Sequence, residues 1–442
     1  MERDLTKGSI TKNLIYFTMP LILGNVFQQL YNIVDTFVVG KYIGSQALAA
    51  VGSSYTLMVF LTSIFIGLCM GASGVFAIYY GKNDQNGLRK SIDVSFYFIA
   101  IIAVIINITV YAGLNWIIEI FKVPKQINMP MKAYLKIIFA GMVFIFIYNF
   151  FANLLRSIGN TLVPLIILAI SALLNIGLDL YFVINVKMDI RGVAWATVIS
   201  QIVAAVLIVV YIHIKMPHLM IRLSNINFDK KIFRQIKSMS LITCIQQSVM
   251  NFGILLVQGL VNSFGITVMA AFAAAVKIDT LAYSPVQDFG NGFSTFIGQN
   301  YGAGKEDRIK KGIKISFTMV LIFSICISFI VCVFSKNLMS IFVSSSDIEV
   351  INIGMEYLRI EGSFYLGIGI LFMLYGFYRA IMMPHMSLIL TIISLGARVI
   401  LAYTLSSIKV IGVCGIWISV PIGWFLADLY GIVYYRRKIW TK

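Results

Sequence analysis

The feature of this sequence that most limits its fold is a series of twelve long apolar segments. They cover, approximately, residues 13–40, 51–80, 92–118, 133–155, 161–184, 192–214, 235–262, 270–300, 312–335, 352–379, 385–408 and 412–435. A helix needs about 20 apolar residues to cross the hydrocarbon core of a bilayer. The sequence therefore predicts an all-α integral membrane protein with 12 transmembrane helices. Only 12% of the residues are charged, about half the fraction of a typical soluble domain, which excludes an ordinary soluble enzyme.

The net charge of +17 comes mainly from Lys and Arg in the connections between apolar segments. If alternate connections lie on the same side of the membrane, the side with both termini carries more than twice as many Lys and Arg residues as the other. Basic residues favour the cytoplasmic side, so we expect both termini to be cytoplasmic. The basic excess then reflects orientation in a lipid bilayer, and no nucleic acid is expected as a partner.

The two halves of the chain resemble each other. When Tyr80-Gly81 is aligned with Tyr301-Gly302, Gly71 aligns with Gly292 without a gap. Each half holds six apolar segments, and an even number gives both halves the same orientation. We therefore expect two six-helix bundles, residues 1–217 and 218–442, related by an internal repeat. Duplication for stability alone is one reading, and parallel bundles that alternate access to a central site are the other.

Ionisable side chains inside the first half are the strongest functional signal, because a charge buried in a membrane is costly and commonly functional. Asp35 lies in the first segment, and Gln28 and Asn32 share its helix face. Asp179 lies in the fifth segment, four residues after Asn175. Further oxygen-bearing side chains, in the fourth and sixth segments, are Asn149 and Thr197. Such ligands suit a hard cation such as Na+, and the carboxyl groups suit a proton equally well. For the neutral side chains, hydrogen bonding between helices is the alternative.

The second half lacks this arrangement. When Arg156 is aligned with Arg379, Arg398 falls at the position of Asn175. The second half also contains Asp279 and Glu361, which either pair with Arg398 or attract a cationic substrate. We therefore group Asp279, Glu361 and Arg398 with Gln28 and Asn32 as candidates for a substrate cleft or a conformational role.

Other sequence signals narrow the function further. Pro20 lies inside the first apolar segment, where its missing N–H should kink the helix. The five Cys and three His residues show neither metal-binding nor catalytic spacing. We therefore expect neither an enzyme nor a bound cofactor, apart from a coupling ion.

Several short stretches carry a resemblance to a known family. They are Ile15–Pro20, Asp35-Thr36, Ala49–Gly52, Lys277–Asp279 and Ser294–Lys305. Through them the chain resembles, over its whole length, the multidrug and toxic compound extrusion family. It is most similar to the branch whose first bundle holds the coupling-ion site.

The resemblance implies a secondary-active multidrug efflux antiporter in a prokaryotic plasma membrane. Such a protein exports cationic drugs and dyes in exchange for Na+ or H+, and we expect it to be a monomer. The related alternative is a flippase of lipid-linked or amphiphilic substrates, from which gradient dependence would distinguish it. By resemblance, the coupling-ion residues are Asp35, Asn149, Asn175, Asp179 and Thr197, and the kinking proline is Pro20.

Overall fold

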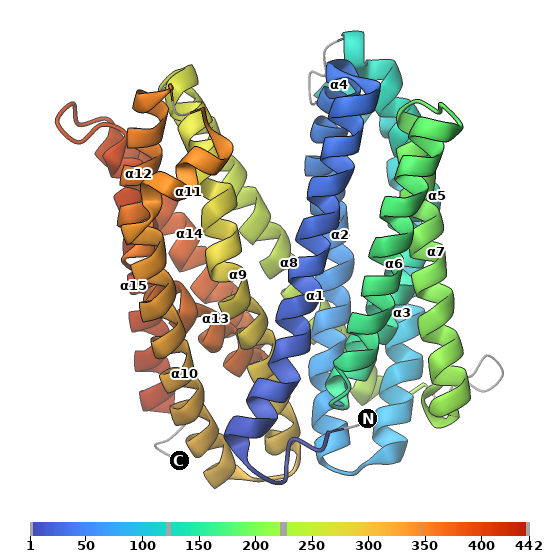
Figure 1. The fold of residues 1–442 in the computed structure, drawn as a ribbon. Helices are drawn as coiled ribbons and strands as arrows, with labels where there is room; N and C mark the ends of the chain where they lie inside the picture. The colour runs from blue at the N-terminus through green and yellow to red at the C-terminus, as the bar shows by residue number, and fades with distance from the viewer. Residues whose placement is uncertain (1–2, 121–124, 222–227, 345, 439–442) are drawn as a thin grey trace. The chain divides into compact units, whose positions relative to one another are not determined.

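The computed structural model describes residues 3–120, 125–221, 228–344 and 346–438, which are helical over most of their length (Figure 1). The helices of the first half are α1 (Ile10–Val38), α2 (Ser45–Gly81), α3 (Gln85–Ala112), α4 (Leu114–Ile120), α5 (Lys125–Ser157), α6 (Leu162–Leu180) and α7 (Ile190–Lys215). Those of the second half are α8 (Lys230–Asn262), α9 (Ile266–Gly302), α10 (Glu306–Val333), α11 (Ser335–Phe342), α12 (Ile348–Gly362), α13 (Tyr365–Ala380), α14 (Pro384–Ser406) and α15 (Cys414–Lys438).

Most of the helices are long and apolar enough to span a membrane. Ten of the described helices are long and apolar enough to cross a bilayer, and α12 with α13, bent by 52° between them, gives an eleventh span. A further long helix is α1, which has 29 residues and contains Pro20. It carries half-buried amides such as Asn25 and Asn32. The predicted all-α membrane fold is confirmed.

The helix bounds themselves repeat between the two halves. The offset that aligns Gly71 with Gly292 also carries both ends of α2 onto those of α9, and both ends of α3 onto those of α10. The offset that aligns Arg156 with Arg379 carries α5 onto α12 and α13 together. The two halves differ here, because α5 is one continuous helix whereas its counterpart is broken at Ser363 and Phe364.

The residues group into two compact units. The first unit contains Met1–Asp4 and Met19–Cys244, and the second contains Leu5–Thr18 and Ile245–Lys442. Two helices are therefore shared: α1 begins in the second unit and α8 begins in the first. The boundary between residues 217 and 218 stays a prediction.

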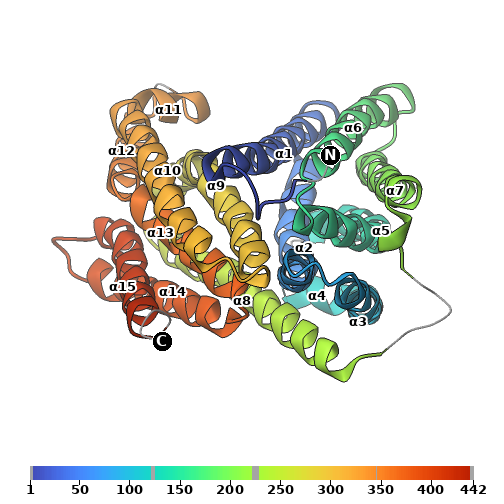
Figure 2. The same cartoon turned by 90° about the horizontal axis from the view of Figure 1, so that it is seen from below.

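Each unit has a central helix that contacts most of its neighbours. In the first unit, α5 packs against α2, α3 and α7, and α6 packs against α7 (Figure 2). In the second unit, α13 packs against α9, α10, α14 and α15. The central position of α5 and α13 follows from the repeat.

Gly71 marks a place where α2 and the first part of α8 approach closely within the first unit. A Cβ atom at this position would lie 2.4 Å from the carbonyl oxygen of Met239 and 2.5 Å from the Cα of Ser240. Small residues permit such close approach of membrane helices. The contact therefore depends on the absence of a side chain.

Gly71→Ala should consequently lower the free energy of unfolding by about 1–3 kcal/mol, the usual effect of overpacking. Thermal unfolding in detergent measures this loss. Gly52→Ala is the matched control on the same helix, because nothing lies within 4 Å of its added Cβ. The control should be as stable as the parent or more stable by about 0.5–1 kcal/mol. Equal melting temperatures for the two variants would contradict the close approach at Gly71.

Candidate functional site

Two carboxyl groups meet inside the first unit. Asp35 of α1 and Asp179 of α6 lie close enough to share a hydrogen bond when one of them carries a proton. Asp179 is fully buried. Among the described residues, no hydrogen-bond partner reaches either carboxyl oxygen of Asp179 or Oδ1 of Asp35. Two ionised carboxylates cannot donate hydrogen bonds to each other, and their mutual repulsion favours a proton on one of them.

Further buried polar atoms on α6 and α7 lack partners. Asn175 lies one turn before Asp179, and neither its Nδ2 nor its Oδ1 has a hydrogen-bond partner among the described residues. The same holds for Oε1 of Gln201 on α7. The two helices are joined by the hydroxyl of Ser171, which donates to the carbonyl of Ser200 at 2.8 Å. Buried polar groups are nearly always hydrogen-bonded, so these atoms are unusual in lacking partners.

The other predicted oxygen ligands use their donors on their own helices. Nδ2 of Asn149 donates to the carbonyl of Ile145 at 2.9 Å. The hydroxyl of Thr197 donates to the carbonyl of Val193 at 3.0 Å. Oδ1 of Asn149 and the lone pairs of the Thr197 hydroxyl are therefore left to act as acceptors. Their helices, α5 and α7, pack against each other.

Tyr134 is a residue of this region that the sequence analysis missed. It lies on α5 within electrostatic range of both Asp35 and Asp179. Tyrosine is common in apolar segments of membrane proteins, so its position alone gave no signal. Only the fold shows that α5 brings a hydroxyl group towards the acid pair.

The remaining predicted residues of the first half lie on α1. Pro20 lies inside the helix, two positions after Thr18, where α1 leaves the second unit. Gln28 is exposed and Asn32 is half-buried. The structure thus places these residues on one helix with Asp35, but only Asp35 meets the second acid.

The acids of the second unit have a different environment. The hydroxyl of Tyr365 donates to Oδ1 of Asp279 at 2.8 Å, and that of Tyr357 donates to Oδ2 at 3.4 Å. Glu361 lies within hydrogen-bonding reach of Asp279, and Arg398 is close enough to attract both acids. The Nε of Arg398 has no hydrogen-bond partner in the described part of the chain. Asp279 is thus supplied with donors and a nearby cation, which the acid pair of the first unit lacks.

Sequence reasoning did not predict the two tyrosines or a further acid in the last span. Tyr357 precedes Glu361 by four residues, and this spacing was the available signal. Asp428 of α15 is 6% exposed, and its Oδ1 has no partner among the described residues. An acid inside an apolar segment was the signal that could have identified it.

Comparisons with known proteins agree with this architecture. The sequence profile of the MatE family matches residues 20–181 and 240–404. The probable multidrug resistance protein YpnP of Bacillus subtilis is 26% identical over 441 residues, covering 99% of this chain and 97% of the relative. The probable multidrug resistance protein NorM of Thermotoga maritima is 25% identical, covering 98% and 94%. A solved MATE family transporter in an outward-facing conformation has a TM-score of 0.93 at 22% identity, covering 99% of this chain and 97% of that one.

Proposed function

Because the chain belongs to the MatE family of multidrug and toxic compound extrusion transporters, we propose that it is a secondary-active antiporter. It exports organic cations such as drugs and dyes in exchange for Na+ or H+. Relatives named as multidrug resistance proteins support a role in efflux. The observation that carries the coupling is the pair of Asp35 and Asp179, whose buried oxygens lack donors.

The coupling ion binds at this acid pair. A proton can be shared between the two carboxyl groups, and Na+ can take oxygens from the carboxylates, from amides and from a hydroxyl group. The additional oxygen ligands in this proposal are those of Asn149, Asn175 and Thr197. The contrast with Asp279, which accepts hydrogen bonds from two tyrosines, favours the first unit as the coupling site.

The helix that carries Asp35 offers a route from ion binding to movement. α1 belongs to the second unit up to Thr18 and to the first unit from Met19. Pro20 removes one backbone hydrogen bond near this point, and proline weakens a helix interior. Binding of a proton or Na+ reduces the negative charge of Asp35 and Asp179. We propose that this change in charge alters the packing of α1 and bends it near Pro20 as access alternates.

The substrate is attracted by negative charge in the second unit. Asp279 and Glu361 lie beside the single cation Arg398. In this proposal a bound organic cation stabilises the state in which both acids are ionised, because two carboxylates then outweigh one guanidinium. Gln28 and Asn32 contribute polar groups from α1. In this proposal both termini are cytoplasmic and the protein works as a monomer in a prokaryotic plasma membrane.

Ethidium efflux from proteoliposomes, with Na+ and pH gradients imposed separately, tests this function. We expect one of the two gradients to drive efflux and an ionophore for that ion to abolish it. Efflux that ignores both gradients, together with scrambling of labelled lipids, would contradict the antiporter and favour a flippase.

A further inference from the structure

A layer of apolar side chains lies one helical turn beyond the acid pair. Val39 follows Asp35 by four residues, so both lie on one helix face. Val183 follows Asp179 by the same spacing. Val193, at the start of α7, contributes from a third helix. These apolar side chains therefore lie further along their helices than the acids, at the end of the bundle where α1 and α6 finish.

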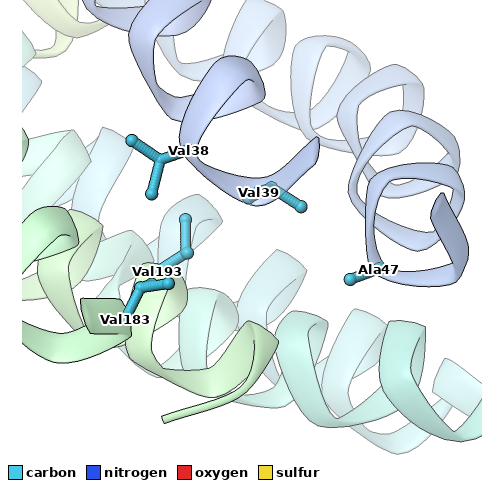
Figure 3. Close-up of a cluster of buried hydrophobic side chains, with 5 residues drawn as sticks. All are labelled: Val38, Val39, Ala47, Val183 and Val193. Carbon is cyan, nitrogen blue, oxygen red and sulfur yellow. The ribbon is translucent and has the colours of Figure 1, made fainter. Parts of the chain in front are cut away.

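These side chains form one buried cluster, the valine layer, which consists of Val38, Val39, Ala47, Val183 and Val193 (Figure 3). Each member is no more than 8% exposed. None of the five side chains carries a polar atom. Aliphatic side chains such as Val34 and Leu48 pack against the cluster, together with Tyr134. An apolar constriction of this kind resists the passage of water and ions.

Both acid-bearing helices continue into π-helical turns at the valine layer. The first, η1, spans Val39–Ile43, and the second, η2, spans Tyr181–Asn185. The N–H of Gly44 donates to the carbonyl of Val39, and the N–H of Val186 to that of Tyr181, each at 3.1 Å. The two π turns contact each other. π turns are rare and are found mostly at functional sites.

The second half of the chain provides an internal comparison. Its corresponding helices, α8 and α14, end at Asn262 and Ser406, and within the described residues neither continues into a π turn. Instead, the N–H of Ser263 donates to the carbonyl of Leu260 at 3.1 Å, which closes a tight turn. The second half also lacks both acids at these positions. The π turns therefore accompany the acid pair, and the repeated fold does not require them.

We propose that the valine layer is a gate that separates the coupling ion from the membrane face where α1 and α6 end, and that η1 and η2 are its moving parts. A π turn can shift along its helix, because an i→i+5 bond is exchanged for an i→i+4 bond without loss of a hydrogen bond. Such a shift rotates the valine side chains out of the layer. The inference rests on the proposed function of the acid pair.

The test measures passive movement of Na+ and H+ into liposomes that contain the full-length protein, without drug. Val183→Asn places an unsatisfied amide in the layer and should raise the leak of the coupling ion about tenfold or more, because an apolar layer no longer closes cleanly around it. Val183→Ile keeps the layer apolar and should leak no more than the parent. Val413→Asn is a control from the second half, because Val413 is the counterpart there of Val193, another member of the valine layer.

The outcomes separate the gate from the transport function. If the parent exchanges ethidium for an ion and Val183→Asn leaks no more than Val413→Asn, the gate is wrong and the antiporter stands. If the parent shows no ion-driven exchange, the proposed function fails whatever the leak. Should Val183→Asn not fold, Val183→Thr keeps the shape of valine, and a leak equal to that of the parent would overturn the gate.

Discussion

Asp179→Asn should reduce gradient-driven ethidium efflux to the level of cells that lack the protein. The amide cannot carry the exchanged proton and removes one of the two charges that bind a cation. When the ion is a cation bound to the Asp179 carboxylate, removing that carboxylate costs about 2–5 kcal/mol of binding free energy. This cost corresponds to a loss of at least about thirtyfold in affinity for the ion. Asp35→Asn should have the same effect. Dye efflux and drug resistance in a pump-deficient bacterium measure both.

Asp189→Asn is the matched control for these variants. Asp189 is an exposed acid that caps the start of α7 through the N–H of Arg191, and asparagine caps a helix as well as aspartate. This control should transport like the parent. If Asp179→Asn, at equal expression, also keeps the efflux and resistance of the parent, the acid pair has no role in coupling.

Arg308→Ala should release the N-terminal segment Leu5–Gly8 from the second unit. The guanidinium of Arg308 donates to the carbonyl of Leu5 at 3.0 and 3.2 Å, to that of Lys7 at 2.8 Å and to that of Gly8 at 2.7 Å. A hydrogen bond from a charged group contributes about 1.5–3 kcal/mol, so opening of the segment should become about tenfold more frequent or higher. The rate of tryptic cleavage after Lys7, followed by mass spectrometry in detergent, measures this opening.

Lys311→Ala is the control for the segment, because Lys311 is an exposed cation on the same helix. It should be cleaved at the rate of the parent. Cleavage of Arg308→Ala at that same rate would show that the segment is held by other contacts, such as the hydrogen bond from the N–H of Leu5 to Oε1 of Gln299 at 3.1 Å.

The spans, the repeat and the family could be predicted from the sequence, because each depends on local composition or on short matching stretches. The transporter class, as opposed to an enzyme, follows from family membership. Asp35 and Asp179 were recognised as acids inside apolar segments. That their carboxyl groups meet depends on how α1 packs in the first unit, and no spacing in the sequence reports it.

Other features were beyond reach of the sequence for physical reasons. The 52° bend between α12 and α13 lies at Ser363 and Phe364, where no proline marks it. The π turns differ from α turns by one hydrogen-bond step, which side-chain periodicity over so short a stretch does not resolve. The placement of Leu5–Thr18 in the second unit has no signal in the sequence, where the first apolar segment is continuous. Contacts with α9 and α10, such as the hydrogen bonds of Arg308, hold the start of this segment in the second unit.

The most direct test of the account is the movement of ions driven by drug alone. Proteoliposomes receive an ethidium gradient with equal Na+ and pH on both sides, and radioactive sodium uptake and internal pH are followed together. The account predicts that one of the two ions moves opposite to ethidium with the parent protein and that this movement is lost in Asp179→Asn. Ethidium transport by the parent without counter-movement of either ion, or ion movement that persists in Asp179→Asn, would contradict it.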